Sequence, residues 1–213
     1  MTKSYQEIRS EYLHGKLDEN SVSGDPFVQF KNWMNEAIES KVPHPTSVIL
    51  ATAGKDQQPS ARVVLLKDVN EKGFVFFTNY NSRKGQQLTD NPKAGLTFFW
   101  MELERQVRIE GTVEKVCAEV SDEYFHSRPF ESRLSAAVSQ QSAVAKSRRE
   151  LESKKEKLRL QHPDEKVPRP ENWGGYVLVP HHFEFWQGRE SRLHDRIVFN
   201  NKGDNWEIRR LAP

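Results

Sequence analysis

Short apolar segments with β-strand periodicity, joined by turns too short for a helix, constrain this chain most. Three of them follow one another at residues 47–53, 61–69 and 74–79, reading SVILATA, ARVVLLKDV and FVFFTN. The connections between them, centred on GKDQQP and NEKG, leave room only for tight turns, and strands joined in this way pair antiparallel. The sequence therefore predicts an antiparallel meander here, not the strand-helix alternation of a parallel sheet.

Further strand patterns lie on both sides of a helical section. We expect strands at residues 94–102, 105–116, 175–180, 181–187, 196–199 and 206–211. We expect helices at residues 82–91, 119–128, 130–139 and 144–160, and another that begins at the capping pair Asp25–Pro26 and stops before Pro43. This order favours a mainly β fold with helices (α+β), an antiparallel barrel that carries helices, over a doubly wound sheet.

The length of 213 residues fits one domain. Residues 1–24 are polar and are interpreted as a mobile N-terminal arm, with a short helix near residues 4–13. Residues 25–213 are then a single domain with a helical insert at about 118–160.

Charge and cysteine content exclude several classes of function. Lys and Arg number 32 against 30 Asp and Glu, a net charge of +2, so any basic site must be local. Cys117 is the only cysteine, which excludes an internal disulfide and a cysteine-rich zinc site, and we expect it to be buried. The adjacent His181 and His182 would point to opposite faces of a strand, so no metal site is expected. With no signal peptide and no apolar run of about 18 residues, we expect a soluble cytoplasmic protein.

The densest cluster of chemically active side chains is FWQGRESRLHDR at residues 185–196. Its aromatic, arginine and histidine side chains suit an anionic, ring-shaped ligand. A salt-bridged surface hairpin is the alternative, with Arg189 and Asp195 as its structural pair.

Two basic clusters are candidate phosphate sites. In RVVLLK, strict strand alternation puts Arg62 and Lys67 on opposite faces, so a shared ligand would require a bulge, backbone contacts or a site between subunits. In NSRKG, Ser82, Arg83 and Lys84 open a helix, where free amides and the helix dipole favour an anion. A capped surface helix explains the second pattern equally well.

Weaker patterns add a possible second phosphate site. Tyr124, Arg128 and Ser132 are spaced i, i+4 and i+8, although Pro129 is expected to bend the helix between them. Other polar candidates, each of low specificity, are Gln106, Gln141 and Ser142. The charged helix at residues 144–160 is typical of a solvated face, and nucleic-acid binding is the less favoured alternative.

Taken in series, these motifs resemble the pyridoxamine 5'-phosphate oxidase family. The resemblance runs through RVVLLK, TNYNSRKG, LERQVRIEG, YFHSRP, QQS, FWQG, RLHDR and RRLAP, and covers nearly the whole chain. It implies a Greek-key FMN-binding split barrel and a homodimer with FMN at the subunit interface. The implied activity is an FMN-dependent oxidase of vitamin B6 metabolism.

The resemblance also implies a reaction. Pyridoxamine 5'-phosphate or pyridoxine 5'-phosphate would be oxidised to pyridoxal 5'-phosphate by hydride transfer from C4' to flavin N5. O2 would accept the electrons and give H2O2, and the amine would also release NH3. A non-catalytic flavin or pyridoxal-phosphate binding protein on the same scaffold is the alternative.

Site roles follow from the resemblance, motif by motif. The residues implied to contact FMN are Arg62, Val63, Val64, Leu65, Lys67, Phe77, Thr78, Arg83, Lys84 and Gln106, with Gln141, Ser142, Trp186 and Arg196 supplied by the partner subunit. The residues implied to bind substrate are Lys67, Tyr124, Arg128, Ser132, Arg192, Leu193 and His194, together with Arg9 and Tyr12 from the arm. Arg192 and His194 are the implied catalytic residues, and Phe77 stands where related sequences often carry Tyr.

Overall fold

The structure, a computed structural model, describes residue 12 and residues 15–213. Arg9 and most of the short helix expected near residues 4–13 lie outside the described residues. Among the described residues, no helix combines the length and the apolar character needed to cross a membrane.

In the described part of the chain, nine strands form one sheet. The strands are β1 (Ser47–Ala53), β2 (Pro59–Leu65), β3 (Asp68–Val69), β4 (Phe74–Asn79), β5 (Lys93–Trp100), β6 (Arg105–Lys115), β7 (Trp173–Gln187), β8 (Asp195–Asn201) and β9 (Trp206–Arg210). Their hydrogen-bonded order is β2-β1-β5-β6-β7-β4-β3, with β8 on β7 and β9 on β8. The pairs β3–β4, β7–β8 and β8–β9 are antiparallel, as the short turns between them predicted, and β4–β7 is antiparallel too.

The α-helices that the structure describes beside the sheet are α1 (Pro26–Glu39), α2 (Arg83–Asp90), α3 (Ala118–Ser127), α4 (Phe130–Val138) and α5 (Arg148–Gln161). The Asp25 side chain accepts a hydrogen bond from the Phe27 amide, so α1 begins at the predicted cap. The last helix starts four residues later than Val144, because Ser147 caps it by accepting from the Glu150 amide.

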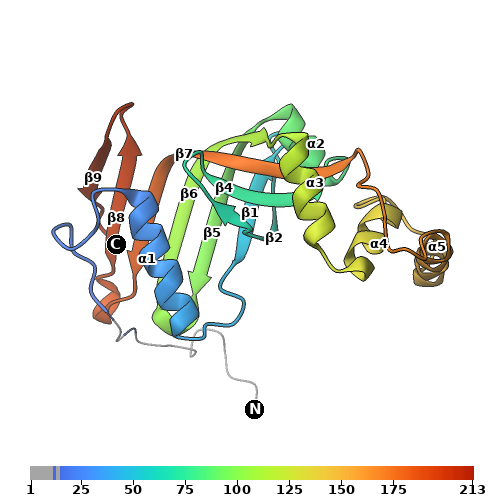
Figure 1. Ribbon diagram of the computed structural model, residues 1–213. Coiled ribbons are helices and arrows are strands. Elements are labelled where there is room, and N and C mark those ends of the chain that lie inside the picture. The colour runs from blue at the N-terminus through green and yellow to red at the C-terminus, as the bar shows by residue number, and fades with distance from the viewer. Residues whose placement is uncertain (1–11, 13–14) are drawn as a thin grey trace, which may run out of the picture. The chain divides into compact units, whose positions relative to one another are not determined.

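The chain divides into two compact units, each assembled from separated stretches. Unit 1 contains the described residues up to Leu50, Gly95–Gly111 and Pro180–Pro213. In this unit α1 packs its apolar face on strands (Figure 1): Phe30 lies 5.0 Å from Phe98 and Trp33 lies 5.3 Å from Phe185, measured between ring centroids. Phe30, Phe98 and Phe185 are fully buried, so this contact is the core of unit 1.

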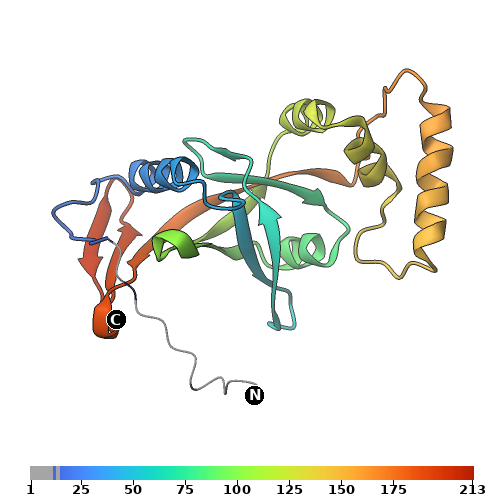
Figure 2. The ribbon, with the colours of Figure 1, turned by 90° about the horizontal axis from the view of Figure 1, so that it is seen from below.

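Unit 2 contains Ala51–Ala94 and Thr112–Val179. Its helical part buries Phe125, Leu134 and Trp173 in one apolar cluster. Helices α4 and α5 lie side by side in both views (Figures 1 and 2), and the Glu131 carboxylate on α4 pairs with α5 through Lys155 at 2.8 Å and Arg159 at 2.7 Å.

Two strand expectations were wrong in detail. A break was expected after Pro180, but β7 runs unbroken through it, because β4 pairs only as far as Leu178 and β8 pairs only from His182. Pro180, which has no amide hydrogen to donate, therefore lies between the part of β7 that pairs with β4 and the part that pairs with β8. The expected strand 61–69 instead breaks between Leu65 and Asp68.

The expectation that Cys117 is buried was also wrong. Its side chain is exposed, at the N-cap position of α3. The apolar character of a cysteine does not decide its burial when a helix begins there.

Candidate functional site

A cavity of about 550 Å³ lies within unit 2, and most of the residues expected there line it. The expected residues in its wall are Val63, Val64, Leu65, Lys67, Phe77, Thr78, Lys84, Tyr124, Arg128, Ser132 and Gln141. The break after β2 explains how Lys67 reaches this wall, since Leu66 and Lys67 leave the strand and strict alternation ends there.

The wall of the cavity carries a buried amine. Lys84 Nζ lies 3.1 Å from Thr78 Oγ1 and 3.2 Å from Gln141 Oε1. Burial, with a smaller effect of the Arg62 charge, lowers the pKa of Lys84. Within the described part of the chain no carboxylate forms an ion pair with this amine, so an anionic ligand would supply the missing countercharge.

The N-terminus of α2 borders this amine. Ser82 caps the helix by accepting from the Gly85 amide at 3.3 Å, and the Arg83 amide donates to Ser142 Oγ at 3.1 Å. Gly85 is required here, because a Cβ at this position would lie 2.1 Å from the Tyr80 carbonyl oxygen. The capped helix start predicted from NSRKG is confirmed, while its use as a phosphate site stays a prediction.

Gln141 and Ser142 reach this cluster from the same chain. The resemblance implied that they come from a partner subunit, whereas the contacts with Thr78, Lys84 and the Arg83 amide lie inside unit 2. A single chain therefore assembles this part of the site.

Arg62 is not among the residues that line the cavity. Its guanidinium bonds Thr52 Oγ1 at 2.5 Å and also Ser60 Oγ, on the side of β2 that faces Gln87. Burial, with a smaller effect of the Arg83 charge, lowers the pKa of Arg62.

Arg128 also lines the cavity, and one of its guanidinium nitrogens lacks a hydrogen-bond partner among the described residues. Helix α3 ends at Ser127 and Pro129 precedes α4, and this bend, predicted from the proline, still leaves Tyr124, Arg128 and Ser132 on one wall. Arg128 Nη1 is buried and has no hydrogen-bond partner among the described residues. Burial lowers the pKa of Arg128, which is the direction expected where an anion is missing.

Aromatic rings also line the cavity. Phe77 stacks on Tyr124 with 4.0 Å between ring centroids, and Trp173 stacks on Phe77 at 5.6 Å. The Arg128 guanidinium lies 4.8 Å from the Trp173 ring. Aromatic and cationic side chains in one cavity suit a planar ligand that carries anionic groups.

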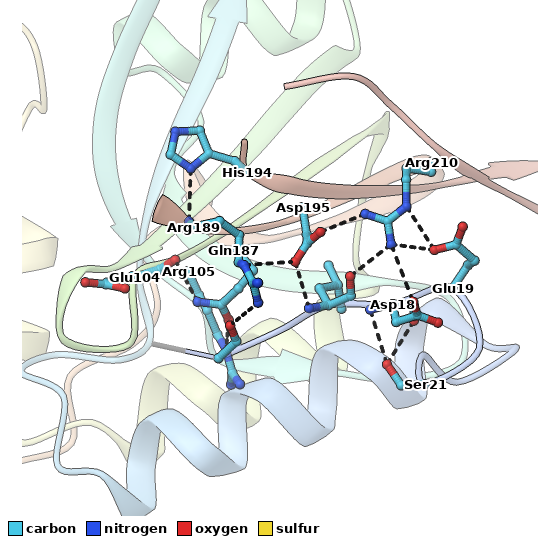
Figure 3. A network of polar contacts seen from close by, with 12 residues as sticks. Asp18, Glu19, Ser21, Glu104, Arg105, Gln187, Arg189, His194, Asp195 and Arg210 are labelled. Atoms are coloured by element: carbon cyan, nitrogen blue, oxygen red, sulfur yellow. Dashed lines mark hydrogen bonds and ion pairs between the residues drawn. The ribbon is translucent and has the colours of Figure 1, made fainter. Parts of the chain in front are cut away.

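The second group of expected residues lies in unit 1, where β7 leads into β8. The Trp186 and His194 rings are 4.8 Å apart, and the Tyr12 ring stands edge-on to both at 5.5 Å. Arg189 donates its backbone N–H to His194 Nδ1 at 3.1 Å (Figure 3). Arg192 has a positive φ of 62° and follows Ser191 at 54°, so the loop turns sharply just before the histidine.

Sequence reasoning missed a buried carboxylate in this group. Glu184 is 4% exposed and accepts from Arg196 Nε at 2.8 Å, from Arg196 Nη2 at 3.1 Å and from Arg108 Nη1 at 3.2 Å. Strand alternation puts Glu184 and Trp186 on one face and Phe183 and Phe185 on the other, which gives no sign that the carboxylate is buried. The bidentate contact fixes the Arg196 guanidinium.

The remaining expected residues are placed as follows. Gln106 lies half-buried on β6, and Leu193 is 71% exposed. Arg189 and Asp195 do pair, at 3.8 Å, so the structural pair proposed from the sequence is confirmed.

Comparisons with known proteins agree with these features. The family described as Pyridoxamine 5'-phosphate oxidase matches residues 34–162, and the Pyridoxine 5'-phosphate oxidase C-terminal dimerisation region matches residues 173–213. A Pyridoxine/pyridoxamine 5'-phosphate oxidase of Nostoc sp. is 50% identical over 100% of both chains. One from Burkholderia lata is 53% identical, covering 97% of this chain and 98% of its own.

Two solved structures share the fold. PhzG from Burkholderia lata, in complex with tetrahydrophenazine-1-carboxylic acid, aligns with a TM-score of 0.89 at 28% identity over 94% of this chain and 99% of its own. A pyridoxamine 5'-phosphate oxidase-related, FMN binding protein from Nostoc punctiforme aligns with a TM-score of 0.70 at 16% identity over 90% of this chain and 100% of its own. The predicted fold class, a mainly antiparallel split barrel with helices, is confirmed.

Proposed function

The chain belongs to the pyridoxamine 5'-phosphate oxidase family, and we propose on this basis that it is an FMN-dependent oxidase. It converts pyridoxamine 5'-phosphate or pyridoxine 5'-phosphate to pyridoxal 5'-phosphate. O2 is the electron acceptor and H2O2 the product, and the amine substrate also yields NH3.

The residues around Lys84 fit the phosphate of FMN. A buried amine without a carboxylate partner, the Thr78 hydroxyl, the Gln141 amide and the start of α2 together offer charge and donors to one anionic group. FMN, when bound, supplies the acceptor for the hydride that leaves C4' of the substrate. The protein holds that phosphate and thereby fixes the ring.

The residues around Arg128 fit the phosphate of the substrate. Arg128 Nη1 lacks a hydrogen-bond partner among the described residues, and Ser132 on α4 lines the same cavity. Lys67 Nζ lies 5.8 Å from the centre of the Tyr124 ring. Two cationic sites in one cavity, which aromatic rings also line, suit two phosphorylated molecules.

The two ring nitrogens of His194 have different surroundings. Nδ1 accepts the Arg189 N–H, which leaves Nε2 as the nitrogen that can donate a hydrogen bond to a ligand. We infer that His194 and Arg192 orient the substrate by donating hydrogen bonds, and that His194 is not the group that removes a proton.

The match to the C-terminal dimerisation region supports a homodimer. We propose that Trp186 and Arg196 of one subunit complete the cavity of the other. Glu184 then matters for flavin binding, since it holds the Arg196 guanidinium.

The unpartnered Arg128 nitrogen in the same cavity as the buried Lys84 amine carries this proposal. The test is to add pyridoxamine 5'-phosphate anaerobically to the FMN-loaded protein and follow flavin absorbance. We expect the flavin absorbance to bleach. When air is admitted, the absorbance should return and H2O2 should form. FMN binding without bleaching would instead support a non-catalytic binding protein.

PhzG suggests a second candidate substrate for the same test, because its structure contains a carboxylic acid without phosphate. Tetrahydrophenazine-1-carboxylic acid, added in the same way, should bleach the flavin far more slowly than pyridoxamine 5'-phosphate. The expectation follows from Arg128, whose buried guanidinium has no anionic partner unless the substrate brings a group that reaches it. Equal rates would remove the preference for a phosphorylated substrate.

A further inference from the structure

A segment before α1 is tied to β9 through a single arginine (Figure 3). Arg210 Nε donates to Glu19 Oε2 at 2.9 Å, and Nη2 donates to the Leu17 carbonyl at 3.1 Å. Arg210 Nη1 donates to Asp195 Oδ1 at 2.7 Å. We call Leu17, Glu19, Asp195 and Arg210 the Arg210 network.

Asp195 links the Arg210 network to the loop that carries His194. Its second carboxylate oxygen accepts the Leu17 amide at 3.2 Å, so Leu17 is held through both its N–H and its C=O. The Leu17 side chain is 5% exposed, which anchors the segment further. The segment is therefore docked in a defined position.

Arg189 supplies a second tie to the same loop. Its guanidinium donates to the Gly15 carbonyl at 2.9 Å, while its backbone N–H donates to His194 Nδ1 at 3.1 Å. One residue thus contacts both the docked segment and the histidine. A displacement of Gly15 would remove one of the contacts that locate Arg189 beside His194.

Two glycines permit a close approach. Gly15 has a φ of +70°, and a Cβ there would lie 2.8 Å from Gln187 Oε1. A Cβ on Gly188 would lie 2.7 Å from Tyr12 Cγ, which shows that the Tyr12 ring rests directly on this glycine. Gly15 and the Tyr12 ring therefore lie against adjacent residues, Gln187 and Gly188.

We propose that Arg210 is a positioning residue for the active site. By bridging Glu19 and Asp195 it docks residues 15–19 on the loop of residues 188–195, and so holds Tyr12 against Trp186 and His194. The inference rests on the proposed function, since it assigns Tyr12 and His194 to the substrate. Arg210 touches none of the residues assigned to the substrate or to FMN in the described structure, and acts through the segment that it holds.

The strand offers a matched control. Arg209 is the neighbour of Arg210 on β9, is 65% exposed, and pairs with Glu207 at 2.6 Å. Arg209→Gln removes the same charge from the same strand and leaves the Arg210 network intact. Any effect seen only in Arg210→Gln then comes from the network and not from the net charge.

The experiment compares Arg210→Gln with Arg209→Gln as FMN-loaded protein. The rate of trypsin cleavage after the exposed Lys16 reports whether the segment is docked. Separate values of KM and kcat for pyridoxamine 5'-phosphate report how well the substrate is positioned. Arg210→Gln should speed cleavage and raise KM about three- to tenfold, the range expected for a partly exposed ion-pair network. Flavin content should match the control.

Glu19→Gln provides a second variant if Arg210→Gln does not fold. It should change both readouts in the same direction but less, because Asp195 and the Leu17 carbonyl still hold Arg210. In the protein that carries both Arg210→Gln and Glu19→Gln, the effects of the two substitutions should not add, since both act on one network.

Cleavage and KM within twofold of the Arg209→Gln control would overturn the proposal. Faster cleavage with an unchanged KM would overturn it too, since docking would then not position substrate. If the unaltered protein oxidises no pyridoxamine 5'-phosphate, the proposed function fails, while unchanged cleavage would separately show that Arg210 does not dock the segment.

Discussion

Replacing Glu184 by glutamine should lower both the free energy of unfolding of this protein and its affinity for FMN. The carboxylate accepts hydrogen bonds from two arginines, Arg196 and Arg108, while its side chain is only 5% exposed. Glutamine keeps the shape, but it removes the charge and turns an NH2 group toward guanidinium donors. At least one of the three charge-assisted bonds must then be lost.

The magnitude follows from the exposure of the partners. Removing one member of a fully buried ion pair costs about 3–5 kcal/mol. Here the Arg196 side chain is 26% exposed and that of Arg108 is 42% exposed, so water can solvate both after the change. We therefore expect the free energy of unfolding to fall by about 2 kcal/mol.

Urea unfolding and a flavin fluorescence titration measure the two effects. Since Glu184 holds the guanidinium that we assign to FMN, the Kd for FMN should rise roughly tenfold, equivalent to about 1.4 kcal/mol. Glu110→Gln is the matched control, because Glu110 pairs with Arg108 at 2.9 Å with both side chains over two-fifths exposed. That change should cost about 0–1 kcal/mol and leave FMN affinity unchanged.

Equal losses of stability in Glu184→Gln and Glu110→Gln would refute the reasoning about burial. A stability loss without any change in FMN affinity would refute the assignment of Arg196 to the flavin.

Two further changes test the cavity and the core. Arg128→Met should raise KM for pyridoxamine 5'-phosphate roughly a hundredfold while raising the free energy of unfolding by about 1 kcal/mol, because the buried Nη1 has no partner until substrate binds. Steady-state kinetics and urea unfolding check the opposite signs, and a loss of stability would contradict the idea of an unsatisfied charge. Burial raises the pKa of Tyr176 to about 12, so the protonated hydroxyl is favoured in the folded state. The contribution of Tyr176 to stability should hold up to about pH 10, and the free energy of unfolding should then fall by up to about 1.4 kcal/mol per pH unit toward pH 12. The Tyr176→Phe variant should lose less stability over that range. Urea unfolding midpoints at pH 9 and pH 11 measure the difference.

Features that depend on neighbouring residues could be predicted from the sequence. Asp25 and Pro26 start α1, Ser82 caps α2, and Pro129 separates α3 from α4, all as expected. Each of these is decided by a side chain within a few residues of the backbone group that it affects. The antiparallel pairing followed in the same way from short turns.

Features that depend on distant partners could not be predicted. Glu19 and Arg210 are 191 positions apart, and the sequence offers many other charges for each. Glu184 reads as an ordinary polar residue in an alternating strand until its two arginines are placed. The break that brings Lys67 into the cavity is likewise invisible in a run of apolar residues.

The interleaving of the two units affects how the protein is made. Unit 2 has all its residues once Val179 has been synthesised, whereas unit 1 still lacks β8 and β9. Trp33 on α1 emerges early, yet its aromatic partner Phe185 emerges only after most of the chain. At ordinary translation rates this leaves Trp33 without that partner on the ribosome for on the order of ten seconds. Slower translation lengthens that interval.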